Sequence, residues 1–332
     1  MNKLNIQDEL NNARMSKVRL NEDKITQLSK IVKALKYKPI SFNTPDLFPE
    51  NDEFIYTNYV FFLVAIDHKT HSKKRFEAFV DGKFYHGSDL LYFLARRLQK
   101  SRKNFFTAEN LVKITAKDVT DIFSINDVTV RNPEQRAMLL KDCARKLIER
   151  YEGDFRNLLK LSKGYLISKD GNGLLQQLKM FKAYEDPLMK KSLLLVKILR
   201  RQKYFDPVDV ENLNFPVDNV LIEIALRSGI VEVREELNRK LDEKDAYILR
   251  KATNNAFKLV SKKSKIPPDI LDDLLWAYGR EVRKAKKIDE IKTTLDDNIE
   301  NKEALMEFLV FISGFDSKRS FNMPNFPETW YF

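Results

Sequence analysis

Apolar residues along the chain follow two different spacings, and each spacing predicts its own kind of element. From residue 1 to 40 they recur at roughly helical period until Pro39 stops the pattern, which predicts one or two helices and a loop. From Phe54 the pattern changes to short aromatic and β-branched segments, YVFFLVAI, KRFEAFV and KFY, with Asp81-Gly82 between the last two. We therefore expect a small antiparallel sheet in this part of the chain.

Beyond Ser88 nearly every segment has helical spacing, and prolines mark the joints between segments. Helix N-caps are expected at Ser88, Thr107, Thr115, Asp206 and Asp269. The pattern predicts a mainly α (α+β) fold, with N-terminal helices and a small antiparallel sheet in residues 1–105 and a helical body in residues 106–332. We expect these two parts to form one compact unit with two lobes.

Composition narrows the class of protein. The 332 residues are 43% apolar, which is enough for a real core. No stretch reaches the roughly 18 uncharged apolar residues of a membrane span, and the first residues lack the apolar block of a signal peptide, so we expect a cytoplasmic protein without a membrane partner. Cys143 is the only cysteine and the chain has 3 histidines, so we expect no disulfide, no metal site and no cofactor.

The charge balance favours an anionic partner. Lys plus Arg number 59 against 48 for Asp plus Glu, a formal net charge of +11. This excess suits a nucleotide phosphate or a nucleic acid. The alternative interpretation is the charged surface of a thermophile's protein, which needs no anionic ligand.

A lysine pair is the first candidate for chemistry. In the segment EDPLMKKSLLLVKIL, Pro187 can open a helix that places Lys190 and Lys191 in its first turn or two. Cations there are unfavourable against the helix dipole. The pair is therefore either solvated or kept for a function.

An aspartate is the second candidate. In NFPVDNVLIEIALRSGIV, Pro216 constrains the backbone and Asp218 precedes a helix that runs to Ser228-Gly229. Asp218 is interpreted first as the N-cap or first-turn acid of that helix. The same position can also place a carboxylate at the mouth of a cleft, where it can stabilise a developing cation.

A carboxylate and an indole form the third candidate. Asp272 precedes Trp276 by four residues in IPPDILDDLLWAYGREV, so one helix face carries both side chains. A purine pocket needs an acceptor for ring N–H groups and a flat surface for stacking. The structural alternative places Trp276 in the core and Asp272 in solvent.

These segments resemble two glycosylase families. The stretch from Pro216 to Gly229, followed by IPP, LDxLLW and a glycine, is similar to the helix-hairpin-helix core of the archaeal 8-oxoguanine DNA glycosylases. The front half resembles the queuosine salvage proteins, from Asn58 through VFFLVAI, KRFEAFVDGKFYHGSDLLYFLARRL and PEQRAMLLKDCARKLIERYEGDF. The aromatic end, Trp330-Tyr331-Phe332, extends this second resemblance to most of the chain.

The resemblance implies a helix-hairpin-helix glycosylase-like body that hydrolyses the base–sugar bond of a queuosine 5'-phosphate-like nucleotide. It implies Asp218 and Lys190 as catalytic residues. It implies base contacts from Trp276 and Asp272. The side chains expected to close the pocket or contact substrate are Asp67, His68, His71, Lys191 and Tyr331.

Two departures from the salvage family concern substrate contacts. Asp67-His68-Lys69-Thr70-His71 stands where that family usually has an aromatic Asn-Phe-x-Phe-Trp loop. Asn219-Val220 stands where the family has Tyr-Arg. A related purine or deazapurine nucleotide is thus an alternative to queuosine.

Two other functions stay open. A DNA glycosylase that flips a damaged purine out of a duplex needs a basic stripe along the groove, whereas a salvage enzyme needs one basic pocket for one phosphate. A non-enzymatic nucleic-acid-binding protein releases no base from any substrate. For the salvage enzyme we expect a monomer with a small-molecule nucleotide substrate.

Overall fold

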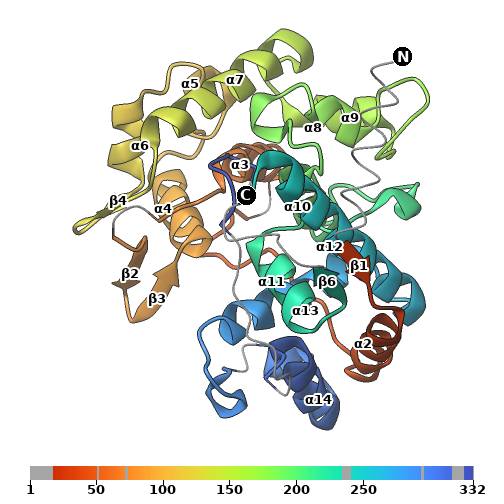
Figure 1. Ribbon diagram of the computed structural model, residues 1–332. Helices are drawn as coiled ribbons and strands as arrows, with labels where there is room; N and C mark the ends of the chain where they lie inside the picture. Colours follow the sequence, from red (N-terminus) through yellow and green to blue (C-terminus); the bar gives the residue numbers. More distant parts are fainter. Residues whose placement is uncertain are drawn as a thin grey trace. The chain divides into compact units, whose positions relative to one another are not determined.

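The computed structural model describes residues 18–50, 52–71, 74–233, 241–292, 295–315 and 325–331. The chain divides into two compact units, both of which are mostly helical (Figure 1). Unit 1 contains residues 1–40 and 213–328, and unit 2 contains residues 41–212 and 329–332. Helices dominate both units and the strands form small antiparallel pairs, which confirms the predicted mainly α fold class.

Unit 1 contains one strand pair and a set of helices. In chain order these are β1 (Val18–Leu20), α2 (Glu22–Ala34), α11 (Asn219–Arg227), β6 (Val231–Val233), α12 (Glu243–Ser264), α13 (Pro268–Val282), η3 (Ile288–Glu290), η4 (Asp296–Asn298) and α14 (Lys302–Ser313). Strand β1 pairs antiparallel with β6, and Arg19 lies opposite Glu232. Val18 and Leu20 therefore lie in a strand, whereas the helical spacing predicted for residues 1–40 holds from Glu22 to Ala34.

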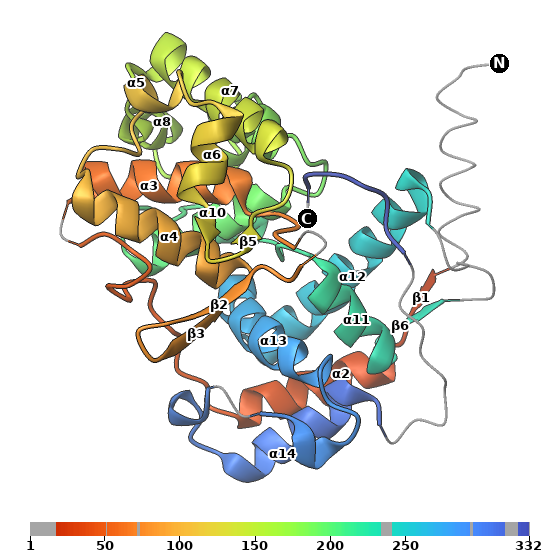
Figure 2. The ribbon, with the colours of Figure 1, turned by 90° about the vertical axis from the view of Figure 1, so that its left-hand side faces the viewer.

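The core of unit 1 forms where α2 packs against α12 and α14, and α11 packs against α12, α13 and α14 (Figure 2). Helices α11 and α13 approach closely because α13 has a glycine at the crossing. A Cβ atom at Gly279 would lie 2.4 Å from Ile224 Cδ1 and 2.5 Å from Val220 Cγ1. This close approach brings the C-terminal part of α13 against the first two turns of α11.

Unit 2 contains the remaining elements. In chain order these are α3 (Glu53–Ile66), β2 (Glu77–Val80), β3 (Lys83–His86), α4 (Ser88–Ser101), α5 (Ala108–Leu111), α6 (Ala116–Ile122), β4 (Ser124–Ile125), β5 (Val128–Thr129), α7 (Pro133–Tyr151), α8 (Phe155–Ser162), α9 (Leu174–Leu178), η1 (Lys182–Tyr184), α10 (Lys190–Arg201) and η2 (Val210–Asn212). Helix α3 packs against α7, α8 and α10 and forms the centre of the unit.

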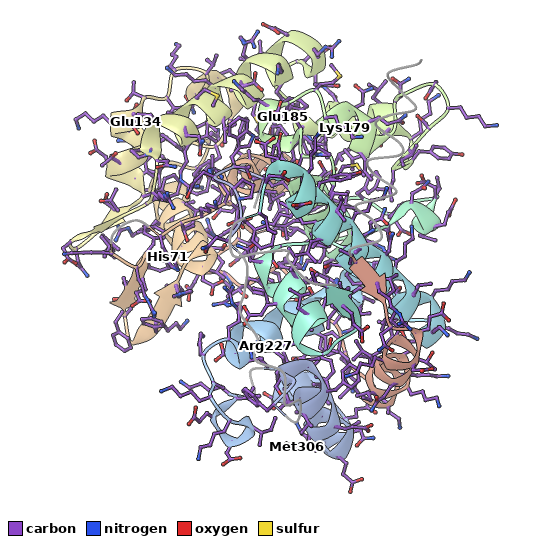
Figure 3. The ribbon with its side chains drawn as sticks, in the orientation of Figure 1. His71, Glu134, Lys179, Glu185, Arg227 and Met306 are labelled. Carbon is purple, nitrogen blue, oxygen red and sulfur yellow. The ribbon has the colours of Figure 1, made fainter. Side chains whose placement is uncertain are left out.

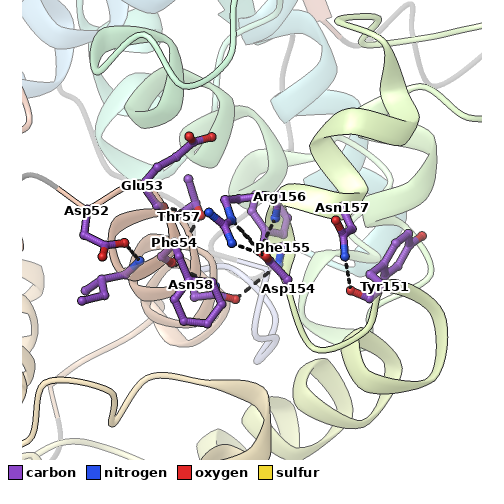
Figure 4. Close-up of polar contacts among 11 residues, drawn as sticks. Asp52, Glu53, Phe54, Thr57, Asn58, Tyr151, Asp154, Phe155, Arg156 and Asn157 are labelled. Carbon is purple, nitrogen blue, oxygen red and sulfur yellow. Dashed lines mark hydrogen bonds and ion pairs between the residues drawn. The ribbon is translucent and has the colours of Figure 1, made fainter.

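The prediction of a strand at YVFFLVAI was wrong, because this segment lies in helix α3. Residues 56–66 are all buried. A helix enclosed on every side needs no polar stripe, so its sequence shows no helical periodicity. Polar contacts hold its first turns: Asp52 accepts from the Ile55 amide at 2.9 Å, and Asn58 Oδ1 accepts from the Phe155 amide at 3.3 Å (Figure 4).

The hairpin predicted around Asp81-Gly82 is confirmed. Strands β2 and β3 pair antiparallel, with Val80 opposite Lys83. Both turn residues have positive φ, 49° for Asp81 and 78° for Gly82, as a tight two-residue turn requires.

The predicted N-caps had mixed outcomes. Thr107 and Thr115 are N-caps, and Thr115 forms a capping box with Asp118. Ser88 and Asp269 instead lie inside the first turns of α4 and α13, whose caps are Gly87 and Pro267. The prediction for Asp206 was wrong: no helix begins there, since the chain continues as a loop to η2.

The division into units differs from the predicted boundary after residue 105. That boundary lies inside unit 2, between α4 and α5. Packing crosses it because α3, from the front of the chain, packs against α7 and α10. Across the described ranges, every helix is too short or too polar to cross a membrane.

Candidate functional site

Asp218 caps α11. Its Oδ1 accepts hydrogen bonds from the amides of Val220 at 2.8 Å and Leu221 at 3.1 Å. These amides have no partner within the helix, so the carboxylate satisfies them and its negative charge lies at the positive end of the helix dipole. The predicted N-cap is therefore confirmed.

Trp276 fixes the other oxygen of the same carboxylate. Its indole Nε1 donates to Asp218 Oδ2 at 3.1 Å. The Arg280 guanidinium lies over the indole ring, 4.4 Å from its centroid, at the distance of a cation–π contact. The structure thus brings Asp218 and Trp276 together, and the close α11–α13 crossing explains how they meet.

Asp272 lies one helical turn before Trp276. The sequence alternative, with Trp276 in the core and Asp272 in solvent, is wrong. Asp272 is 2% exposed, whereas Trp276 is only partly buried. Asp269 and Asp273 are also buried, at 4% and 3% exposure. The N-terminal half of α13 therefore places three carboxylates where its helix dipole favours negative charge.

The lysine pair of α10 divides into two environments. Lys190 is the first residue of the helix and is partly buried, and its amide donates to Asp186 Oδ2 at 2.9 Å. The helix thus begins at Lys190, not at Pro187. Lys191 is fully buried, and its Nζ donates to the Ala65 carbonyl at 2.6 Å. The solvated-pair interpretation is wrong for Lys191.

Lys191 belongs to a buried polar chain with His68. Lys191 Nζ lies 3.2 Å from His68 Nδ1, and His68 Nε2 lies 3.0 Å from Gln135 Oε1. Because an amide oxygen only accepts, His68 carries its proton on Nε2 and accepts from Lys191 on Nδ1. Burial, followed by the charges of Lys190 and Arg136, holds the pKa of Lys191 well below its usual range. Burial and the Lys191 charge lower the pKa of His68 in the same way.

The remaining residues of the predicted 67–71 loop take separate positions. Asp67 Oδ1 accepts from the Ser88 hydroxyl at 2.6 Å, next to the His68 chain. His71 lies beside the β2–β3 hairpin (Figure 3), where its Nδ1 accepts from the Phe76 amide at 2.9 Å. Its ring contacts that of His86 at 4.8 Å, and burial lowers its pKa. Within the described ranges, no three His, Cys, Asp or Glu side chains are grouped to hold a metal ion.

Tyr331 lies in unit 2 beside Trp330, and the two ring centroids are 5.9 Å apart. Trp330 Nε1 donates to the Lys182 carbonyl at 3.0 Å. Phe332, the third aromatic residue of this predicted segment, lies outside the described residues.

Two polar residues that sequence reasoning missed organise these groups. Arg136 is fully buried and donates to the carbonyls of Ile66, His68 and Lys69 where α3 ends. Asp186 is 1% exposed, and its carboxylate accepts from the amide of Lys190, the first residue of α10. Both had a signal: Arg136 stands four residues before Leu140 on the apolar face of its helix, and Asp186 directly precedes Pro187, three residues before α10 begins.

Lys190 belongs to unit 2, whereas Asp218, Asp272 and Trp276 belong to unit 1. A shared cavity for the amine, the carboxylates and the indole stays a prediction. What is observed is a pair of local arrangements: a capped carboxylate bound to an indole in unit 1, and a buried lysine–histidine chain in unit 2.

Replacing Lys191 by methionine is expected to remove a pH-dependent part of the stability. A lysine whose pKa is lowered by folding binds its proton more tightly in the unfolded chain, so its stability contribution is complete above the unfolded pKa of about 10.4 and falls as pH decreases. Wild-type unfolding free energy should rise with pH relative to Lys191→Met, by at most about 1.4 kcal/mol per unit. Urea unfolding measured at several pH values from about 7 to about 10 tests this.

The matched control is Lys190→Met, which removes a neighbouring, partly exposed amine from the same helix turn. Its stability should still rise with pH because Lys191 stays buried, but over a changed range, since the variant removes one of the charges that lower the pKa of Lys191. Parallel curves for Lys191→Met and the wild type would contradict the buried, perturbed amine.

The structure is that of a mainly helical protein, and two family models match parts of the chain. Residues 47–205 match the family model of the queuosine salvage protein. Residues 189–307 match the family model of N-glycosylase/DNA lyase, and this range contains the lysine pair, Asp218 and Trp276. Both predicted resemblances are confirmed. No curated protein matches the chain.

Proposed function

We propose that this protein is an N-glycosidase that hydrolyses the base–sugar bond of a modified purine or 7-deazapurine nucleotide, similar to queuosine 5'-phosphate, and releases the free base. The two family matches support a glycosylase-type function. The observation that carries the proposal is the Asp218 carboxylate, held by two helix amides and one indole N–H.

Cleavage of a base from ribose builds positive charge on the sugar, so a fixed carboxylate can lower the barrier. Asp218 suits this role because both of its oxygens are already held and little reorganisation is needed. It either orients the attacking water or bonds covalently to the sugar. Asp272 would hold the polar edge of the base.

Trp276 has two roles in this mechanism. Its N–H positions Asp218, and its ring provides the flat surface for a base. One face of the ring lies under Arg280, so only the opposite face is left for stacking.

Lys190 would act from the beginning of α10. It can neutralise Asp218 before substrate arrives, bind a 5'-phosphate, or attack the sugar carbon as an amine. Since Asp186 already accepts from the first amide of α10, a phosphate would contact the Lys190 ammonium instead of the helix end. The 67–71 loop, Lys191 and Tyr331 would shape the pocket and not react.

The direct test is incubation with a panel of modified and ordinary nucleoside 5'-monophosphates, scored by chromatography of the free base. Release from at least one 7-deazapurine or purine monophosphate, in preference to its unphosphorylated nucleoside, is the expected result. No base release from any member of the panel would overturn the proposal.

A DNA glycosylase that removes a damaged purine such as 8-oxoguanine is the second candidate, favoured by the match of residues 189–307 and by the net charge of +11. It predicts duplex binding that weakens steeply with salt and base release from lesion-bearing duplexes. Borohydride trapping of a covalent adduct, lost in Lys190→Met, would assign lyase chemistry to Lys190. Neither result is expected for a nucleotide N-glycosidase.

Replacing Trp276 by phenylalanine is expected to separate positioning from stacking. The variant keeps a flat ring but loses the N–H that holds Asp218, so kcat should fall about tenfold while KM stays within about twofold. Steady-state kinetics on the reactive nucleotide measure this split. Trp330→Phe, the same change at the other tryptophan, is the control and should alter neither constant. An unchanged kcat with a raised KM would leave Trp276 as a stacking surface alone.

A further inference from the structure

A cavity of about 380 Å³ opens on the surface of unit 2, where α7 runs beside η1. Its lining residues are Val112, Met138, Lys141, Asp142, Arg145 and Lys182. The volume lies in the range of small-molecule sites. None of these residues has a part in the proposed base release.

The rim of this cavity is cationic. Lys141 and Arg145 are four residues apart, so they share one face of α7. Both are exposed, as is Lys182 across the cavity. The acid in the lining, Asp142, accepts from the Lys146 ammonium at 2.8 Å, from the Lys182 amide at 2.8 Å and from Arg145 Nη2 at 3.5 Å. Arg145 Nη1 also donates to Glu149 at 3.3 Å. With Lys146 and Glu149 included, four cations meet two acids here, so the net charge favours an anion.

The other part of the lining is apolar. Val112 and Met138 are partly buried, and the unbranched Met138 side chain can adapt to the shape of a ligand. A simple inorganic anion would use the cations and leave this surface in water. A ligand with an anionic end and a flat, apolar body uses both.

An aromatic side chain adjoins the cationic rim. The Lys182 ammonium lies 5.9 Å from the centroid of the Trp330 ring, and Trp330 donates to the Lys182 carbonyl. Trp330 is thus coupled to the cavity through Lys182. A change in the charge environment of Lys182 should alter the emission of this indole.

We propose that this cavity is a second ligand site, which binds an organic phosphate. Lys141, Arg145 and Lys182 hold the phosphate, and the body of the ligand covers Val112 and Met138. Because Arg145 already contacts Asp142 and Glu149, the ammonium groups of Lys141 and Lys182 supply the main charge-assisted contacts with the phosphate. The site is separate from the proposed catalytic residues, and it holds whether or not the chain releases a base.

The test uses the full chain carrying Trp276→Phe. The sequence has 2 tryptophans, so this variant retains Trp330 alone. Its emission is followed during titration with adenosine 5'-monophosphate, with adenosine and with inorganic phosphate. A saturable change is expected with the monophosphate, and inorganic phosphate should bind about tenfold more weakly. Adenosine should give no change.

Two further variants test whether the fluorescence change comes from binding at this cavity. Lys141→Gln with Arg145→Gln should weaken monophosphate binding about tenfold or more without touching Trp330. Lys160→Gln with Lys169→Gln removes two exposed lysines elsewhere in unit 2 and should bind as the parent does. No saturable change, or a change that survives Lys141→Gln with Arg145→Gln, overturns the proposal. Loss of base release in a separate assay does not affect it.

Discussion

Replacing Asp218 by asparagine is expected to lower base release at least about a hundredfold, because the variant removes the negative charge that stabilises the cationic sugar. The fold should survive, since asparagine is also a good N-cap and its amide oxygen can accept from Val220 and Leu221. The side-chain nitrogen would then face the Trp276 N–H, so a small loss of stability, about 1 kcal/mol, is expected. Chromatography of the free base and thermal melting measure the two effects.

The control for this experiment is Asp242→Asn. Asp242 caps α12 in the same unit, accepting from the Asp245 amide at 2.7 Å, and it is exposed. The substitution makes the same chemical change at another helix N-cap, so it should leave activity unchanged and cost no more stability than Asp218→Asn. Undiminished base release by Asp218→Asn, with normal melting, would remove Asp218 from the mechanism.

Local signals in the sequence predicted those parts of the fold that depend on neighbouring residues. The cap at Asp218 follows from an acid placed directly before an apolar helix, and the hairpin follows from Asp81-Gly82 between two alternating segments. In both cases the backbone groups to be satisfied lie within three residues of the side chain or turn that satisfies them. No distant contact is needed to recognise them.

The strand predicted in place of α3 failed for the opposite reason. Periodicity reports an element only when one side of it faces water, and residues 56–66 face water on no side. The length of the apolar run, together with Asp52 and Glu53 before it, was the remaining helical signal. Burial on all sides is a property of the assembled unit and cannot be seen in one segment.

The burial of Lys191 also could not be predicted from the sequence. Two adjacent lysines have the same composition and differ by about 100° around the helix, so one meets the end of α3 and the other lies at the surface. Which of the two is buried depends on how α10 packs against α3. The bond from Trp276 to Asp218 likewise depends on the α11–α13 crossing, which the sequence signals only through Gly279.

Replacing Arg136 by methionine is expected to destabilise unit 2 by about 3–5 kcal/mol. Its guanidinium is fully buried and donates to four carbonyls: Arg131 at 2.7 Å, Ile66, His68 at 2.5 Å and Lys69 at 3.1 Å. Methionine fills a similar volume but leaves these acceptors without their donor at the negative end of the α3 dipole. Burial lowers the pKa of Arg136 to about 10, so the group is still charged at pH 7.

Urea unfolding at pH 7 measures this loss of stability. Two further variants test which property of the Arg136 side chain causes it. Arg145→Met makes the same change nine residues further along α7 at a side chain that is 56% exposed, and it should cost less than about 1 kcal/mol. Arg136→Lys keeps the charge but cannot reach all four carbonyls from one ammonium, so it should recover only part of the stability. If Arg136→Met costs no more than Arg145→Met, the end of α3 does not depend on this arginine. If Arg136→Lys is as stable as the wild type, charge alone accounts for the effect and the forked geometry of the guanidinium does not.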